Sequence, residues 1–435
     1  MGRVLKVPEE GGQLAHETAE AVARRSYGKL VAFLAARIRD VAGAEDALSD
    51  AFAAALTDWP LNGIPAQPEA WLLTVARRKM LDGVRRRRTA EDAQGHLLLM
   101  NELAGDEAPV PDERLGLMFA CAHPAIDPAI RAPMILQTIL GFDAATIASA
   151  FLVAPAAMSQ RLVRAKTKIR EAGVPFHLPE DDELPGRLDA VLGAIYATFS
   201  EGWSDPEGTE TRRRNMAEDG IWLGQLVASL LPEEPEALGL LALMLHAEAR
   251  RGARRDDAGE FVPLAEQDPV LWDAALIDAA EGLLFRAGTM GRIGRYQLEA
   301  AVQSAHIARR KTGRTDWAAI EQLYGALETI TGSPVVAINR AVAIAEGRGA
   351  AEGLKVLDEL SADARLSEYQ PYWAARAGLL AHAGLHAEAA HAYDRAIGLE
   401  ADPAVRRFLQ KRRDSLAREA GEGGARPAGL GATVS

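Results

Sequence analysis

The sequence has little of several features that define whole classes of protein. It contains a single cysteine, Cys121, which excludes a disulfide framework and suits a reducing compartment. Aromatic residues make up only 6% of the chain, and runs of β-branched residues are few, which favours helices over strands. No apolar segment approaches the length of a membrane span, and residues 1–12, expected to be a loose arm, lack the apolar core of a signal peptide. We therefore expect a cytoplasmic, all-α protein that does not enter a membrane.

Motifs of enzymes and metal sites are also scarce. Cys121 and His123 are not followed by a second pair at metal-ligand spacing, so a buried small residue is the better interpretation of Cys121. Gly288, Gly291 and Gly294 have the spacing of a nucleotide-binding fingerprint, but the stretch before them has a helical pattern, which predicts a helix–helix corner. The chain has no nucleophile elbow, phosphate loop or paired-carboxylate motif. We predict that the protein is not an enzyme and that it holds no cofactor and no metal.

Positive charge is short overall but concentrated in two segments. The formal net charge is −12, which is unusual for a protein that binds nucleic acid. Residues 71–89 nevertheless carry seven Lys/Arg against one acid, and residues 153–171 carry five against one. A solvated basic face is the ordinary interpretation of such runs. Two cationic patches on an acidic body favour localised contacts with a polyanion instead.

Apolar periodicity predicts three helices before residue 90. The first begins near His16 and is expected to break at Gly43. The second, from Ala44 to Trp59, has an apolar stripe and carries four acids mainly away from it: Glu45, Asp46, Asp50 and Asp58. Residues 60–67, PLNGIPAQ, are expected to be a loop because they contain two prolines and a glycine. The third helix opens at Pro68 and has a basic face opposite its apolar stripe.

The second basic segment has the spacing of a helix-turn-helix. Met158, Leu162, Ala165 and Ile169 form the expected buried stripe of its second helix. That stripe leaves five polar side chains outside: Ser159, Gln160, Arg161, Arg164 and Lys168. Gln can pair with adenine and Arg with guanine in the major groove, while Arg and Lys nearer the end of the helix suit phosphate. The segment therefore predicts a DNA-reading helix.

The C-terminal half contains a faint repeat with a period of 36 residues. Tetratricopeptide (TPR) intervals are matched by Trp373, Gly384, Ala389, Tyr393 and Ala396. Shifted back by 36 positions, they meet Ala337, Arg348, Gly353, Leu357 and Leu360, with Arg in place of the turn glycine. The pattern predicts TPR-like helical hairpins. The tryptophans of this half are most simply core and hairpin packing, and a ligand or peptide groove lined by some of them is the alternative.

The order of these features resembles a known family. An acidic helix, a Pro/Gly loop and then AWLLTVARRKMLDGVRRRR resemble region 2 of bacterial sigma factors of the extracytoplasmic-function (ECF) group. The helix-turn-helix at this distance resembles sigma region 4, although Leu152 stands where relatives usually have a turn glycine. The segments GLLALMLHAEARRGAR, EQDPVLWDAALI and SPVVAINRAVA resemble the subgroup with a C-terminal TPR-like domain. The resemblance covers about residues 11–417.

The resemblance implies partners and site residues. It implies that the acidic helix binds core RNA polymerase, through Glu45, Asp46, Asp50 and Phe52. It implies that the loop and the basic helix bind the −10 element of promoter DNA, through Asn62, Arg77, Arg78, Lys79, Arg85, Arg86, Arg87 and Arg88. The position of Arg78 is often Asn in relatives, so a phosphate contact is expected there. It implies that the helix-turn-helix binds the −35 element, through Ser159, Gln160, Arg161, Arg164 and Lys168.

These patterns predict a domain organisation and a function. We expect sigma region 2 at 11–90, a linker with one short helical segment at 91–111, sigma region 4 at 112–174, a linker at 175–186, a TPR-like helical domain at 187–417 and a disordered tail at 418–435. The predicted function is promoter-specific initiation by a sigma factor whose C-terminal domain modulates its activity and binds an unidentified ligand or protein. The alternative is a conventional helix-turn-helix regulator with a TPR-like effector domain. A TPR scaffold with incidental basic helices explains the sequence less well.

Overall fold

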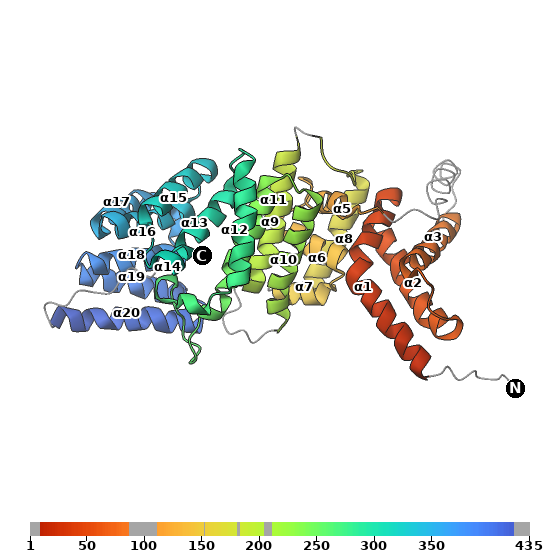
Figure 1. The fold of residues 1–435 in the computed structure, drawn as a ribbon, viewed down its shortest axis with the longest axis horizontal. Helices are drawn as coiled ribbons and strands as arrows, with labels where there is room; N and C mark the ends of the chain where they lie inside the picture. The colour runs from red at the N-terminus through yellow and green to blue at the C-terminus, as the bar shows by residue number, and fades with distance from the viewer. Residues whose placement is uncertain (1–8, 87–110, 152, 181–182, 204–210, 422–435) are drawn as a thin grey trace. The chain divides into compact units, whose positions relative to one another are not determined.

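A computed structural model describes residues 9–86, 111–151, 153–180, 183–203 and 211–421 (Figure 1). These residues form helices joined by turns, with one isolated antiparallel bridge between Arg255 and Phe261 and no strand in the described ranges. The all-α prediction is therefore confirmed. The chain divides into two compact units, one of residues 1–202 and 212–220 and the other of residues 203–211 and 221–435. The division falls inside the segment 187–417 rather than at the predicted linker 175–186.

The first unit begins with three helices: α1 (Glu9–Ile38), α2 (Val41–Asn62) and α3 (Pro68–Arg86). α2 packs against both α1 and α3 (Figure 1). Trp59 of α2 is buried and meets Trp71 of α3 edge to face, with ring centroids 5.6 Å apart. The first helix already begins at Glu9, inside the arm predicted for residues 1–12, of which residues 1–8 lie outside the described ranges.

Two further predicted boundaries in this bundle were wrong. The first helix ends at Ile38 rather than Gly43, because Asp40 caps α2 by accepting the backbone N–H of Gly43 at 3.2 Å. Gly43 thus lies in the first turn of α2. At the other end α2 continues through Pro60 to Asn62, so the loop is shorter than predicted. Proline fixes a helical φ and removes only one hydrogen bond there, which a last helical turn tolerates.

The helix-turn-helix part of the first unit contains four helices: α5 (Arg114–Cys121), α6 (Pro128–Leu140), α7 (Ala144–Ala150) and α8 (Pro155–Glu171). The side chain of Asp127 caps α6, and that of Asp143 caps α7. α7 packs against α8, as a helix-turn-helix requires, while Leu152 in the turn lies outside the described residues. The last helix of this unit is α9 (Leu184–Trp203).

The two parts of the first unit are packed together. α1 contacts α5 and α6, and α2 contacts α8. Gly28 of α1 lies so close to α6 that an added Cβ would be 2.3 Å from the carbonyl oxygen of Ile139, so no larger residue fits without a shift. Buried Cys121 contacts the hydroxyl of Thr138 at 3.5 Å, which confirms the prediction of a buried small residue.

The second unit contains the remaining helices. α10 (Thr211–Leu230) crosses the division between the units. It is followed by α11 (Pro235–Ala249), α12 (Ala274–Thr289), α13 (Arg295–Ile307), α14 (Arg309–Thr312), α15 (Trp317–Thr331), α16 (Pro334–Arg348), α17 (Ala350–Glu359), α18 (Gln370–His382), α19 (His386–Leu399) and α20 (Pro403–Gly421). Short 3-10 helices lie at 251–253, 264–266, 269–271, 360–362 and 364–366. Gly291 and Gly294 form the corner between α12 and α13, as predicted.

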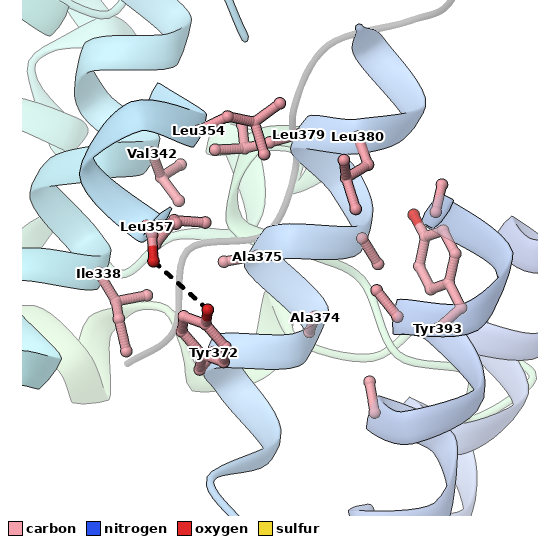
Figure 2. Close-up of a cluster of buried hydrophobic side chains, with 14 of the residues drawn as sticks. Ile338, Val342, Leu354, Leu357, Tyr372, Ala374, Ala375, Leu379, Leu380 and Tyr393 are labelled. Atoms are coloured by element: carbon pink, nitrogen blue, oxygen red, sulfur yellow. Dashed lines mark hydrogen bonds between the residues drawn. The ribbon is translucent and has the colours of Figure 1, made fainter. Parts of the chain in front are cut away.

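Two helix pairs of this unit repeat each other. α16 begins at Pro334 and α18 at Gln370, and α17 begins at Ala350 and α19 at His386, so both separations are 36 residues. Figure 2 shows their shared core, in which the hydroxyl of Tyr372 donates to the carbonyl oxygen of Leu357 at 3.3 Å. The first pair has a turn glycine after all. It is Gly349, with φ 103°, one residue beyond the Arg348 that the repeat pattern indicated.

The last helix, α20, packs on α19 and also binds the segment 255–266 near the start of the unit. Arg407 and Lys411 both pair with Glu260, and the rings of Phe408 and Phe261 meet edge to face at 5.5 Å. Asp402, just before α20, accepts from Arg255 at 2.7 Å. α20 runs into the segment 418–435 predicted as a disordered tail, and residues 422–435 lie outside the described ranges.

Candidate nucleic-acid interface

The four residues predicted to bind polymerase differ in exposure. Asp46 and Asp50 lie one helical turn apart on α2, and both are exposed. Phe52 is half-buried. Asp50 is 3.6 Å from the ammonium of Lys79 on α3, but both side chains remain more than half exposed, so this pair contributes little to stability. Asp46 and Asp50 thus form an acidic surface that a basic partner can reach.

Glu45 is withdrawn from that surface. Its carboxylate forms an ion pair with Lys166 of α8, and the two side chains are only 14% and 10% exposed. Burial raises the pKa of the Glu45 carboxyl, although the neighbouring Lys166 opposes the shift. A second pair links the same helices, because Arg170 of α8 lies 3.3 Å from the carboxylate of Asp40.

The pair of Glu45 and Lys166 was missed at the sequence level. Lys166 was counted only as part of a basic segment, yet it follows Ala165 and is flanked by Leu162 and Ile169 of the buried stripe. A lysine at the edge of an apolar stripe is a usable signal for a buried partner, because buried lysines are rarely left unpaired. Glu45 could not be found the same way, because it is 121 residues distant in the chain.

The basic helix α3 presents some of its cations to solvent. Arg78 and Lys79 are exposed, whereas Arg77 is half-buried with its guanidinium 5.3 Å from the ring centroid of Phe33 on α1. Asn62, at the end of α2, is exposed and donates to Asp58 at 2.7 Å. The side chains of Arg85 and Arg86 are not described, and Arg87 and Arg88 lie outside the described ranges. The structure therefore describes the side chains of only four residues of the predicted −10 surface: Asn62, Arg77, Arg78 and Lys79.

All five residues of the predicted −35 surface are exposed on α8. Arg161, Arg164 and Lys168 line an open cavity of about 470 Å³, together with residues 125–127 and 129–130. Asp127 is the acid of that lining, and its carboxylate is already engaged with the backbone N–H of Ala129. The cavity is thus cationic and open to solvent, a combination that suits an anionic backbone.

The segment after the helix-turn-helix is fixed to it. Val174 and Phe176 are buried, and the carbonyl of Phe176 lies so close to Gly116 of α5 that an added Cβ would be 2.3 Å away. Arg187 of α9, only 8% exposed, donates to the carbonyl oxygen of Phe119 at 2.9 Å. Phe176, in the predicted linker, and Arg187, just after it, are therefore both held against α5.

The second unit buries several basic groups. Arg250 is 3% exposed and donates to the neutral side chain of Gln303 at 2.6 Å. Burial, with Arg250 nearby, lowers the pKa of His246 to about 4 and that of His306 to about 3. The Glu281 carboxylate lies 3.5 Å from His246, but the Glu281 side chain is 44% exposed, so burial of the imidazole dominates the pKa of His246.

Trp272 is buried beneath the Arg309 guanidinium, and Trp317 and Trp373 are partly buried in hydrophobic clusters. Trp222 is exposed, so the packing interpretation holds for only some tryptophans.

Two further features are absent from the described part of the chain. No group of three or more His, Cys, Asp and Glu is arranged there to hold a metal ion. None of the described helices is both long and apolar enough to cross a membrane.

Comparisons with known proteins identify two segments and one relative. Residues 22–90 match sigma-70 region 2, and residues 187–288 match a family of unknown function, DUF6596. An uncharacterized protein of Rhizobium meliloti (strain 1021) is 38% identical over 384 residues, which cover 86% of this chain and 90% of the relative. No solved structure matches. The chain therefore belongs to the family of this Rhizobium meliloti protein, and the sigma-70 region 2 at its N-terminal end supports a sigma-factor role in transcription initiation.

Proposed function

We propose that the protein is a sigma factor of the ECF type, with a C-terminal TPR-like domain that modulates its activity. One observation carries the proposal: α2 presents exposed Asp46 and Asp50, while the adjoining α3 presents exposed Arg78 and Lys79, within a segment that matches sigma-70 region 2. An acidic and a basic surface on neighbouring helices suit two different partners. Those partners are core RNA polymerase and promoter DNA.

The helix-turn-helix supplies the second DNA contact. Gln160 and Arg161, near the start of α8, can reach base edges in a major groove, and Arg164 and Lys168 can neutralise phosphates. Phosphate contacts give affinity that falls with salt, whereas base contacts give sequence preference. Two separated DNA surfaces favour a sigma factor over a conventional regulator, which needs only one.

The C-terminal part is proposed to brace the sigma domains rather than cover them. Its support is the hydrogen bond from Arg187 to α5, which holds α9, the first helix of the predicted C-terminal domain, within the same unit as the helix-turn-helix. The two helix pairs that are offset by 36 residues support the TPR-like description.

A reconstituted transcription assay tests the proposal. Purified full-length protein is mixed with core RNA polymerase and a panel of double-stranded promoter fragments from its own genome. A sigma factor initiates at specific start sites without any other initiation factor. A conventional regulator gives no transcript until a separate sigma factor is added, and that result would replace the proposal with the alternative.

A further inference from the structure

Helix α12 and its two flanks carry the most exposed large apolar side chains in the described ranges. Phe285, in the second half of α12, is 75% exposed, and Ile293, just after the helix, is 72% exposed. Val270, just before the helix, is 86% exposed, and its neighbour Leu271 is exposed as well. Isolated exposed apolar residues are ordinary, but several on one helix and its flanks indicate an interaction surface.

The exposed side of α12 also carries a row of small residues. Ala275, Ala279 and Gly282 follow one another at turns of the helix, and Phe285 comes next on the same side. The other side, which includes buried Ala280, packs in the second unit, where α12 contacts α11 and α13 (Figure 1). An added Cβ at Gly282 would have no neighbour within 4 Å outside its own helix. Glycine weakens a helix interior, and the close approach of another backbone offsets that cost, so this space suits a second helix.

The charges on this side are complementary to themselves about Gly282. Asp278 lies four residues before Gly282 and Arg286 lies four residues after it, and both are exposed. If two copies of α12 cross antiparallel at Gly282, a two-fold axis passes through the crossing point. Residues equally far from Gly282 in opposite directions then reach the same level, so Asp278 of each copy meets Arg286 of the other. Arg286 also donates to the carbonyl oxygen of Pro232 at 3.4 Å, and its remaining N–H groups can reach a carboxylate.

The same axis places large apolar side chains opposite small or apolar ones. Phe285 lies three residues after Gly282 and Ala279 three residues before it, so the ring of one copy reaches the level of the small side chain of the other. In an antiparallel pair, the flank before α12 in one copy lies beside the flank after α12 in the other. Val270 and Leu271 are thereby brought to Ile293. One symmetric contact therefore covers the exposed apolar side chains and pairs the charges.

We propose that the protein forms a homodimer through α12, in which the two helices cross antiparallel at Gly282. α12 has 16 residues, so it is about 24 Å long and about 10 Å wide. With its flanks, a two-fold contact along it buries on the order of 1,000 Å² in total, below the size of most stable complexes. The dimer is therefore reversible and forms at micromolar concentrations. It involves the second unit and does not depend on the function proposed above.

Charge exchange across the axis tests the pairing. Sedimentation velocity of the full-length protein from about 1 µM to about 100 µM measures the dissociation constant of the dimer. D278R places arginine opposite Arg286, and R286D places aspartate opposite Asp278, so each change should raise that constant about tenfold. D278R/R286D restores opposite charges and should return the constant to the wild-type value. The matched controls are D257R and R310D, equal charge changes at exposed positions outside α12, which should leave the constant unchanged.

Cross-linking tests the crossing point. Gly282 meets its own copy at the axis, so G282C should form a disulfide-linked dimer on mild oxidation with copper phenanthroline. Ala275 is seven residues from the axis, so in A275C the two introduced thiols are about 21 Å apart along the helices and should not link. The native Cys121 is buried, and burial raises the pKa of its thiol to about 12, so it does not compete.

Three results would overturn the inference. A wild-type protein that stays monomeric at about 100 µM would show that α12 takes another partner or none. No recovery of the dimer in D278R/R286D would show that these charges do not meet across the axis. Linking of A275C as fast as G282C would refute the antiparallel crossing. Recovery in the double variant, in contrast, excludes misfolding as the cause of the losses in the single variants.

Discussion

At the scale of single residues, three carboxylates on α2 have three different environments. Glu45 is buried against Lys166, Asp50 is exposed but near Lys79, and Asp46 is exposed. A substitution at Glu45 therefore disturbs packing as well as charge. Asp46 and Asp50 can be changed with little effect on folding, which makes them the better test of the polymerase surface.

Reversing both exposed acids should abolish association with core RNA polymerase. In D46K/D50K, attraction to a basic surface becomes repulsion, and the loss should be about 2–5 kcal/mol. The measurement is co-purification with polymerase, alongside the thermal midpoint of the variant. The control is E17K/E20K, an equal charge change on the exposed face of α1. Normal yield of polymerase with D46K/D50K would show that this surface is wrongly assigned.

Substitution of Arg161 and substitution of Lys168 should change DNA binding in different ways. Arg161 lies near the start of α8, where side chains reach base edges, so R161A should relax preference at one −35 position by about 1–3 kcal/mol. Lys168 lies two turns later, and K168A should weaken all promoters alike and reduce the salt slope by about one. Binding to matched and mismatched −35 fragments at several salt concentrations separates the two. Equal losses on every sequence for R161A would make it a phosphate contact.

At the scale of elements, replacing glycine by alanine should have opposite effects on stability in two helices. An added Cβ at Gly353 of α17 would lie 2.6 Å from the carbonyl oxygen of Ala341, whereas the space around Gly282 of α12 is open. G353A should therefore destabilise the second unit although alanine is the better helix former. G282A should stabilise it by up to about 1 kcal/mol. Thermal unfolding of the two variants checks the contrast, and a stabilising G353A would mean that α16 and α17 are less closely packed.

Arg187 should matter to the helix-turn-helix although it lies in α9. R187A leaves the carbonyl of Phe119 without its donor inside the protein, at a cost of about 1–3 kcal/mol. We expect lower stability of the first unit and weaker −35 binding, measured by amide exchange in α5 and by DNA affinity. D189A, an exposed change on the same helix, should alter neither. Unchanged exchange in R187A would remove a main support for bracing.

Local sequence patterns predicted the helices well and their ends less well. The stripes of α3 and α8 were read directly from residues such as Leu73 and Met158, because an amphipathic helix repeats its apolar positions every three or four residues. The end of α1 was misplaced because Gly43 looks like a helix breaker, whereas the decisive residue is the cap Asp40. Gly349 was missed because the first hairpin turns after one residue and the second after three.

The sequence predicted only those features of the candidate site that depend on a single helix. Exposure of Arg161, Arg164 and Lys168 follows from the stripe of their own helix. The ion pair between Glu45 and Lys166 does not, because it depends on how α2 and α8 pack together. The same holds for the bond from Arg187 to α5, since no pattern within α9 names a carbonyl in another helix.

At the scale of the whole molecule, the second unit should be sensitive to acid. His246 and His306 have pKa values of about 4 and about 3 in the folded protein, against about 6.5 when unfolded. The unfolded chain therefore takes up protons first, so stability is highest above pH 6.5 and falls as the pH drops toward 4. The loss should be about 1 kcal/mol per histidine per pH unit.

Amide exchange in α11 and α13, corrected for intrinsic rates, measures this loss between pH 7 and 5. In H246Q/H306Q the titrating groups are gone, so the pH dependence in these helices should be reduced even if overall stability is lower. An unchanged dependence would assign the acid sensitivity to other groups. Exchange in the first unit should be the same in the variant and the wild type at each pH, because neither histidine belongs to that unit.

The contacts of α20 set a limit on how the C-terminal helices can vary in number. Repeat arrays with open ends can gain or lose hairpins, because each hairpin touches only its neighbours. Here α20 follows the last hairpin and also meets the segment 255–266, through Phe408 on Phe261 and Arg407 on Glu260. A hairpin inserted between α17 and α18 would carry α20 away from that segment. The array is therefore closed on itself, and evolution by duplication of a single hairpin is blocked unless both ends change together.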